Sequence, residues 1–288
     1  MSTAAPEAPA PTAPFAFFEL RVVRTRRLGP TMLRVTLGGD GLTGFASGGR
    51  DQSFSLFLPH PGQSAPVVPT GADWFGRYRS MHPAERAIMR AYTVRAQRPG
   101  ELDVDFALHG DCGPASRWAR AAQAGDRVTL LGPGVADNKS VCFRPPGGTD
   151  WVLLSGDETA LPAIAGILES LPAGLPVRAF VQVPEWDDVT ELPTAADAAV
   201  TWLVRAGRSG HRTDAAVAAV RSAALPAGTP YAWIAGEAGT VRALRRHLVR
   251  EREFPRRAVT FGGYWRLGSS EEKLAAEAAA GVSRIPED

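Results

Sequence analysis

The hydrophobic and polar positions of this chain follow two different patterns, and the change falls near residue 147. Up to about residue 134, apolar residues come in short alternating or β-branched runs separated by Gly, Pro or Asp, which is typical of antiparallel strands. Six such strands are expected, at 17–28, 31–39, 52–59, 90–97, 101–110 and 126–134. Strands this short and this closely spaced favour an antiparallel barrel.

Two segments interrupt the strands of the first half. Residues 113–125, GPASRWARAAQAG, place Ala and Trp on one helical face and end on Gly125, so they predict a helix. Residues between Pro59 and Arg90 show no clear period and are expected to form a loop-like insertion.

In the second half, strand and helix alternate. The run WVLLSG (151–156) is continuously apolar, as in parallel strands covered on both faces. Further strands are expected at 177–183, 199–206, 231–236 and 258–265, with helices at 160–172, 213–224 and 240–254. This alternation predicts an α/β domain with a parallel sheet. We therefore divide the chain into a disordered tail (1–16), a β-barrel domain (17–146) and an α/β domain with a C-terminal helical tail (147–288).

Composition and charge exclude several classes of function. The chain is 44% hydrophobic and 22% charged, as in globular proteins, and its net charge of +2 does not suggest a nucleic-acid-binding protein. The two cysteines form no CxxC pair or metal-ligand cluster. No run of about 20 apolar residues and no signal-peptide pattern is present, so we expect a cytoplasmic protein without stable membrane insertion. The oligomeric state stays open.

The segment RAYTVR, residues 90–95, places an aromatic ring and a hydroxyl between two guanidinium groups. In an extended strand Arg90 and Tyr92 share one face, while Thr93 and Arg95 share the other. Arginine suits phosphate because its planar fork donates two parallel hydrogen bonds. Tyrosine can stack on a flat ring, so a flavin with its pyrophosphate fits this segment. An exposed barrel strand with mixed polar residues is the alternative.

Three turns are further candidates for binding a nucleotide. LHGDCGPASRW (108–118) opens a helix whose free N–H groups favour an anion, with Ser116 in its first turn. SGDETA (155–160) links a buried strand to a helix, yet it is not GxGxxG, and Asp157 and Glu158 would repel a phosphate. IAGEAG (234–239) repeats the small-acidic pattern, so both turns can line one crevice. Ordinary strand–helix loops are the alternative.

Taken together, these segments resemble the siderophore-interacting proteins, flavin-dependent ferric-siderophore reductases of the ferredoxin-reductase-like superfamily. The resemblance covers residues 17–268 and rests on RAYTVR, LHGDCGPASRWA, GDRVTLLGPG, SGDETALPAIAGILESLP, WIAGEAGTVRALRRHL and GGYWRLG. It implies FAD in the barrel domain and NAD(P)H in the α/β domain. It implies no catalytic side chain and no resident metal.

The resemblance also implies roles for individual residues. In the barrel domain, Tyr92 is expected against the isoalloxazine ring, Thr93 near its N5 edge and Arg90 on the phosphates. The remaining FAD-binding residues would be Arg95, His109, Gly113, Pro114, Ala115 and Ser116. In the α/β domain, residues of the two turns and of GGYWRLG would lie at the nicotinamide nucleotide or the flavin: Gly156, Asp157, Glu158, Thr159, Gly236, Glu237, Tyr264 and Trp265.

The implied reaction passes electrons from NAD(P)H through FAD to a ferric siderophore, releasing iron as Fe(II), and the cofactor supplies the chemistry. Two alternatives are a reductase of a ferredoxin or another acceptor, and a non-enzymatic protein that binds ferric chelates. Some family members are described as holding the chelate with lysines. Only two of the 32 basic residues here are lysines, so arginines would replace them. Candidates are Arg77, Arg79, Arg144, Arg256 and Arg266.

The nicotinamide donor and the siderophore are open at this point. Glu185, Asp187 and Asp188 follow one strand and would favour the ribose 2′-hydroxyl of NADH. Arg205 and Arg208 follow the next strand and would bind a 2′-phosphate. Because two guanidinium groups at a strand end are otherwise unexplained, NADPH is the expected donor.

Overall fold

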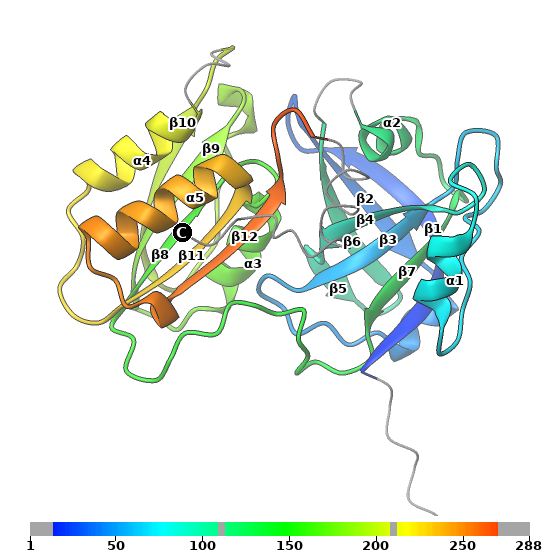
Figure 1. The fold of residues 1–288 in the computed structure, drawn as a ribbon, viewed down its shortest axis with the longest axis horizontal. Coiled ribbons are helices and arrows are strands. Elements are labelled where there is room, and N and C mark those ends of the chain that lie inside the picture. The colour runs from blue at the N-terminus through cyan, green and yellow to red at the C-terminus, as the bar shows by residue number, and fades with distance from the viewer. Residues whose placement is uncertain (1–13, 109–112, 208–211, 270–288) are drawn as a thin grey trace, which may run out of the picture.

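A computed structural model of the protein describes residues 14–108, 113–207 and 212–269, which form two domains side by side (Figure 1). The domains are joined by the connection between the last barrel strand, which ends at Pro133, and the first strand of the second sheet, which begins at Trp151. The predicted boundary, between residues 146 and 147, lies within this connection.

The first domain is a curled antiparallel sheet of seven strands. These are β1 (Phe15–Arg27), β2 (Met32–Gly38), β3 (Ser53–Leu58), β4 (Ile88–Thr93), β5 (Ala96–Arg98), β6 (Glu101–Ala107) and β7 (Arg127–Pro133). Their order is β4-β3-β7-β1-β2-β6-β5, so the two ends of the sheet are successive segments of the chain. The inward side chains, among them Leu56, Val104 and Leu130, form one buried core. The antiparallel sheet predicted from the sequence is confirmed.

The segment RAYTVR is not one continuous strand, and here the prediction was wrong. Strand β4 ends at Thr93 and pairs with β3, whereas β5 begins at Ala96 and pairs with β6. Thr93 and Val94 are both buried, so the alternation of faces stops between them. The chain turns between β4 and β5 because these two strands lie at opposite edges of the curled sheet. Arg95 therefore does not share a strand face with Thr93.

The other differences from the predicted elements are smaller. The insertion after Pro59 contains a helix, α1 (Trp74–Ser80), whose Tyr78 packs on Phe57 under the outer face of the barrel. Strand β1 begins at Phe15, two residues inside the predicted tail, and pairs Phe15 with Pro133. Helix α2 spans Pro114–Ala121, so it ends before Gly125.

The second domain is a parallel sheet covered on both faces, as predicted. Its strands β8 (Trp151–Gly156), β9 (Pro176–Val183), β10 (Asp197–Val204), β11 (Pro230–Glu237) and β12 (Val259–Trp265) lie in the order β10-β9-β8-β11-β12. Helix α3 (Leu161–Ser170) packs on one face, and α4 (Arg212–Ser222) and α5 (Ala238–Arg246) pack on the other. The order of the strands reverses between β8 and β11, which is where ligands bind in open α/β sheets.

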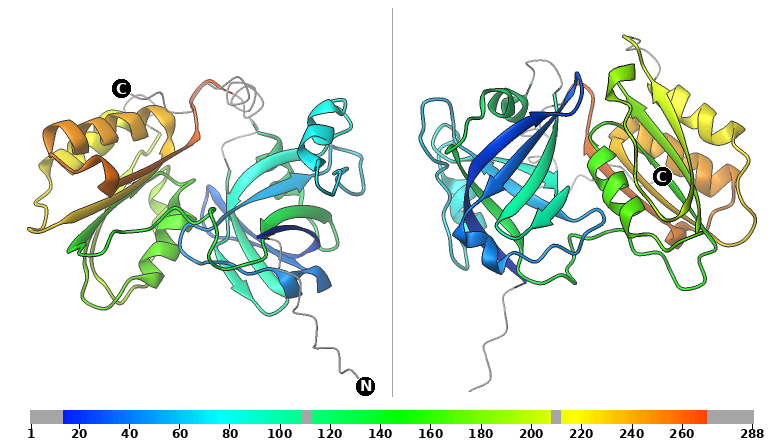
Figure 2. Two further views of the ribbon diagram at one scale, coloured as in Figure 1. Left: turned by 60° about the horizontal axis from the view of Figure 1, so that its bottom comes forward. Right: turned by 180° about the vertical axis from the view of Figure 1, so that it is seen from behind.

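Helix α3 lies on the side of its sheet that faces the barrel (Figure 2). Gly166 of α3 lies against the backbone carbonyl of Arg50, so closely that a Cβ at position 166 would collide with it. Further along the boundary, Asp188 accepts hydrogen bonds from the Thr31 N–H (2.9 Å) and hydroxyl (2.8 Å). These contacts between the domains are short and partly buried, and they set how the two domains meet.

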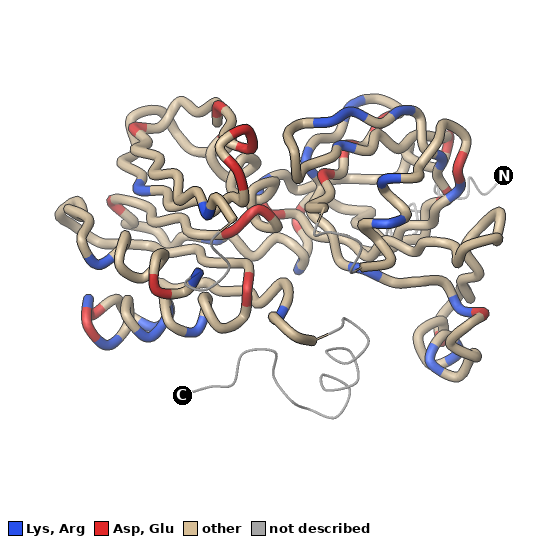
Figure 3. The backbone as a smooth tube through the Cα atoms, turned by 90° about the horizontal axis from the view of Figure 1, so that it is seen from above, with Lys and Arg blue, Asp and Glu red and all other residues tan. Residues whose placement is uncertain are grey.

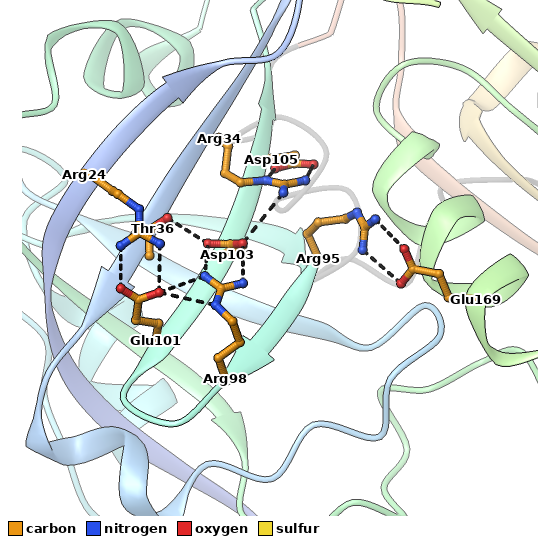
Figure 4. Close-up of polar contacts among 9 residues, drawn as sticks. All are labelled: Arg24, Arg34, Thr36, Arg95, Arg98, Glu101, Asp103, Asp105 and Glu169. Carbon is orange, nitrogen blue, oxygen red and sulfur yellow. Dashed lines mark hydrogen bonds and ion pairs between the residues drawn. The ribbon is translucent and has the colours of Figure 1, made fainter. Parts of the chain in front are cut away.

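Acidic and basic positions are interspersed over both domains (Figure 3). On the barrel, three arginines and three carboxylates form a network across β1, β2, β5 and β6 (Figure 4). Asp103 is buried and accepts hydrogen bonds from Arg98 (2.8 and 2.9 Å) and from the Thr36 hydroxyl (2.7 Å). The other members of the network are Arg24, Arg34, Glu101 and Asp105.

This network predicts a loss of stability in acid. Hydrogen bonds from Arg24 and Arg98 lower the pKa of Glu101 from 4.5 to about 2. Burial opposes ionisation of Asp103, but hydrogen bonds from Arg98 and Thr36 outweigh it and lower its pKa. Carboxyl groups with a lower pKa in the folded state stabilise it above their unfolded pKa, and the stabilisation disappears as they become protonated.

We therefore expect the thermal unfolding midpoint to fall as the pH is lowered from 4.5 towards about 2. In Arg98→Gln the midpoint should start lower and fall less over this range, because Glu101 and Asp103 lose their shared partner. Circular dichroism melts at half-unit pH steps measure both curves. Parallel curves for the two proteins would contradict this account.

None of the helices within 14–108, 113–207 and 212–269 is both long enough and apolar enough to cross a membrane.

Candidate functional site between the barrel and the second sheet

The residues of the RAYTVR motif lie at the end of β4, on the edge of the barrel sheet. Tyr92 is partly buried, and its ring lies against Phe106 of β6, with centroids 4.4 Å apart. Phe106 in turn contacts Trp118 of α2 at 5.8 Å. The three rings connect β4, β6 and α2, so the motif strand and the helix predicted to bind an anion belong to one surface. Arg90 donates to the carbonyl of Met89 at 2.8 Å.

The amino-terminal end of α2 is a candidate to bind an anion. Gly113 is its N-cap residue, Pro114 is the first helical residue, and among the described residues no side-chain capping hydrogen bond is found at this end. The Ser116 hydroxyl donates to the carbonyl of Ala107 at 3.2 Å, so its proton is not directed at a ligand. Backbone N–H groups in the first turn are therefore the expected donors to a phosphate, rather than the Ser116 hydroxyl. His109 lies outside the described residues.

Arg95 departs from the rest of the motif. Its guanidinium makes a two-pronged ion pair with Glu169 near the end of α3, with N–O distances of 2.6 and 3.1 Å (Figure 4). The pair lines a cleft of about 1050 Å³ between β5 and α3. Tyr92, Thr93 and Tyr264 do not line this cleft. Arg95 thus connects the two domains, and its ion pair does not share this cleft with the residues expected to meet a flavin.

In the second domain, the two turns that were expected to share a crevice do meet. Strands β8 and β11 are parallel neighbours, and the buried Asp157 carboxylate bridges their ends. It accepts hydrogen bonds from the Thr159 N–H (3.0 Å) and hydroxyl and from the Glu237 N–H (2.9 Å). Burial, together with the nearby charge of Glu158, raises the pKa of Asp157. Asp157 therefore organises the crevice rather than pointing at a ligand.

Glycine is required at the second turn. Gly236 has φ +130°, and a Cβ there would lie 2.7 Å from Cγ of Asp157. Glu237 caps α5 by accepting from the Thr240 N–H at 2.8 Å. Its acidic side chain is therefore directed at a helix end rather than at the expected position of a phosphate.

Glu158 is also bound internally. It is fully buried and forms a two-pronged ion pair with Arg205, with distances of 2.6 and 2.7 Å. Arg205 is thus not an unoccupied guanidinium at a strand end, which corrects the reason given for expecting NADPH. Nη1 of Arg212 is buried 4.0 Å from the same carboxylate and has no hydrogen-bond partner among the described residues. Arg208 lies outside the described residues.

Some of the acidic residues that would have favoured NADH also make hydrogen bonds within the protein. Asp188 is buried and binds Thr31 of the barrel, and it exchanges capping hydrogen bonds with Glu185. Of the three acidic residues considered, Glu185 and Asp187 are exposed.

The two aromatic residues at the end of β12 face opposite sides. The Trp265 indole N–H donates to Asp157 at 2.9 Å, and the Arg212 guanidinium lies 5.2 Å from its ring centroid. Tyr264 points the other way, to the barrel, where it lies close to the Thr93 side chain. Burial raises the pKa of Tyr264 well above its ordinary value, so the phenol stays protonated at neutral pH. The contact joins the RAYTVR motif directly to the last strand of the second sheet.

The arginines considered for substrate binding are scattered. Arg77 and Arg79 belong to α1, which lies at the end of the barrel far from the second domain (Figure 1). Arg144 pairs with Asp137 at 2.9 Å, and Arg256 precedes the amino-terminal end of β12. Only Arg266 directly follows Tyr264 and Trp265.

Sequence reasoning missed Asp51, Trp233 and Glu169, which lie at the boundary between the domains. Nothing local distinguishes Asp51 in its glycine-containing loop or Glu169 in an ordinary helix. The segment GGRDQSFSL around Asp51 has no periodicity and no motif that would predict a contact with the other domain.

Both domains of the chain resemble proteins of known families. Residues 21–137 match the model of the siderophore-interacting FAD-binding domain, and residues 149–268 match that of the siderophore-interacting protein. A siderophore utilization protein from T. fusca is similar in structure, with a TM-score of 0.78 and 35% identity over 90% of this chain and 96% of that one. Solved ferredoxin reductases share the two-domain fold.

Two named relatives match most of the chain. The ferric vibriobactin reductase ViuB of Vibrio cholerae is 31% identical over 88% of this chain and 90% of its own length. The NADPH-dependent ferric-chelate reductase of Escherichia coli is 33% identical over 86% and 92%. With both domains matched by family models and full-length relatives above 30% identity, the chain belongs to the siderophore-interacting protein family and carries that family's FAD-binding domain.

Proposed function

We propose that the protein is an NAD(P)H-dependent ferric-siderophore reductase that holds FAD in its barrel domain. The names of the two relatives support an oxidoreductase acting on ferric chelates. The observation that carries the proposal is the contact of the two domains beside the expected flavin strand, where Tyr264 lies close to Thr93 and the Trp233 indole N–H donates to Asp51 at 2.9 Å. It joins the expected flavin strand to the carboxyl-terminal edge of the second sheet, where a nicotinamide nucleotide would bind.

The residues present fit FAD. Tyr92 offers a partly exposed ring on a rigid strand, backed by Phe106, and Thr93 offers a hydroxyl beside it. The amino-terminal end of α2 would offer backbone N–H groups to the pyrophosphate. Arg90 would add a forked cation. The further FAD residues proposed are His109, Gly113, Pro114, Ala115 and, through its backbone, Ser116.

When bound, FAD supplies the step that protein side chains cannot, accepting hydride from the nicotinamide and passing single electrons to Fe(III). The protein's own residues would bind and orient the cofactors and shield them from water. Tyr264, which lies close to Thr93, would shield the end of β4 beside the expected position of the ring. Trp265 is fixed by Asp157 and Arg212 on the opposite side. Gly156, Thr159, Gly236 and Glu237 complete the crevice for the nucleotide.

NADPH is the donor that we propose, and Arg212 is its most suitable anchor among the described residues. Its side chain is 23% exposed, and it lies at the amino-terminal end of α4 beside Trp265. Arg205 would act through Glu158, which it holds, rather than by binding phosphate itself.

For the ferric siderophore, we propose Arg266 as the arginine that meets an anionic chelate. It is the one candidate among Arg77, Arg79, Arg144, Arg256 and Arg266 that follows the carboxyl end of β12, next to Trp265. Fe(II) binds the hard oxygen donors of such chelates less tightly than Fe(III), so reduction would release the iron.

An anaerobic assay tests the proposed function. Purified protein should be yellow, NADPH should bleach the bound flavin faster than NADH, and a ferric siderophore should then yield Fe(II) in the presence of a ferrous trap. The control is free FAD at the same concentration. Fe(II) no faster than with free FAD would refute the reductase, and a colourless protein that binds ferric chelate would favour a carrier instead.

A further inference from the structure

We propose that Asp51 is a positioning residue that holds the barrel and the second sheet in the register needed for transfer between them. Asp51 lies in the barrel, just before β3, and is buried. Its carboxylate accepts a hydrogen bond from the Trp233 indole N–H of β11, in the other domain, at 2.9 Å. It also accepts from the backbone N–H groups of Cys142 and Phe143, at 3.0 to 3.2 Å.

Asp51 thus touches all three parts of the chain that have to keep their relative places. Cys142 and Phe143 belong to the connection between the domains, and Trp233 belongs to the sheet beyond it. Among the described residues, no ion pair is found at Asp51, and its donors are three neutral N–H groups. A carboxylate accepts on both oxygens and donates nothing once ionised, so it suits three converging donors.

A second link runs beside the first. Trp233 packs edge-to-face on Tyr264, with ring centroids 6.4 Å apart and planes at 80°. Tyr264 reaches back to Thr93. Strand β4 pairs with β3 so that Thr93 lies opposite Ser53, two residues from Asp51. On the other side, strands β11 and β12 are parallel neighbours.

Two neighbouring strands of the barrel therefore meet two neighbouring strands of the second sheet. One link is the Asp51–Trp233 hydrogen bond, the other is the approach of Tyr264 to Thr93, and the rings of Trp233 and Tyr264 pack together between them. Moving Trp233 would move Tyr264 with it, and so would change what faces Thr93. Small displacements at reacting centres cost large factors in rate, so a contact that fixes this distance affects transfer without touching either cofactor.

The other links between the domains are placed differently. Arg95–Glu169 joins β5 to α3, and its carboxylate is 40% exposed. Thr31–Asp188 joins the turn after β1 to the segment after β9. Neither contacts Trp233 or Tyr264, so they provide matched controls that connect the same two domains elsewhere.

The inference rests on the proposed function, and Asp51→Asn is the variant that tests it. Asparagine keeps the shape but turns an NH₂ group toward N–H donors that need an acceptor. We expect the FAD dissociation constant to change by less than about threefold, while the anaerobic rate of flavin reduction at saturating NADPH falls by about tenfold or more. The KM for NADPH should change less than this rate.

A spectroscopic readout separates positioning from general weakening. Visible circular dichroism of the bound flavin reports the asymmetry around the ring, and it should change in Asp51→Asn and keep its wild-type form in Glu169→Gln. Trp233→Phe keeps the ring packing but removes the indole N–H. It should show a smaller change in the same direction, and it decides the question if Asp51→Asn does not fold.

Wild-type rates and spectra in both Asp51→Asn and Trp233→Phe would overturn the proposal. So would an equal loss in Glu169→Gln, because any weakened interface would then have the same effect. If neither nicotinamide nucleotide reduces the wild-type flavin, the proposed function fails, yet the dichroism comparison still tests whether Asp51 sets the surroundings of the ring.

Discussion

Replacing Arg205 with methionine is expected to lower the free energy of unfolding by about 3 kcal/mol, because it leaves the Glu158 carboxylate buried without its main partner. Glu158 is fully buried, and only 9% of the Arg205 side chain is exposed. Two short hydrogen bonds join them. Arg212, 4.0 Å away, compensates in part, so the loss should lie at the lower end of the range for broken buried pairs.

The double variant Glu158→Gln/Arg205→Met removes the buried charge itself and should recover a large part of this loss. Arg221→Met is the surface control, since Arg221 and Glu251 are 57% and 50% exposed, and it should change stability by no more than about 0.5 kcal/mol. Urea unfolding followed by circular dichroism measures all of these values. If the double variant were as unstable as Arg205→Met, the buried charge would not be the cause.

Arg90→Gln is expected to weaken FAD binding by about 30-fold, which is the loss of one charge-assisted hydrogen bond of about 2 kcal/mol. Arg95→Gln, five residues along the same motif, should leave FAD affinity within about twofold, because Arg95 is held by Glu169 in the other domain. Arg90 lies on β4 beside Tyr92, whereas Arg95 follows the point at which the strand ends.

Titration of FAD into the cofactor-free proteins, followed by quenching of flavin fluorescence, gives both affinities. Melting curves without FAD show whether either variant is destabilised. Equal weakening in the two variants would restore Arg95 to the FAD site and contradict its assignment as a link between domains.

The strands and helices could be predicted to within a few residues wherever the hydrophobic pattern was strong. The continuous apolar run at 151–156 and the alternation at 126–134 are local properties of the chain, and local burial patterns decide such elements. The helix at Trp74–Ser80 was missed because its apolar residues, Trp74 and Tyr78, pack on the outside of the barrel under an irregular segment. The break after Thr93 was missed because it depends on which strand each half pairs with.

Most residues of the candidate site could also be identified from the sequence. The segments carrying Arg90, Tyr92, Thr93, Gly156, Asp157, Gly236, Tyr264 and Trp265 were recognisable as a set, and the structure brings Thr93 to Tyr264 and Asp157 to Trp265. The partner of each charged side chain, however, could not be predicted from the sequence. Asp157, Glu158 and Glu237 were expected to face a nucleotide, and they are instead held by N–H groups, a hydroxyl and an arginine within the domain.

The sequence by itself determined two domains, their classes of sheet, and the residue types that a flavin and a nucleotide require, because periodicity and motif spacing are properties of neighbouring residues. Only the tertiary structure decided which charges are paired with one another. Arg205 meets Glu158 across 47 residues, Arg95 meets Glu169 across 74, and Asp51 meets Trp233 across 182. The packing of sheets and domains brings such partners together, and no local sequence pattern predicts that packing.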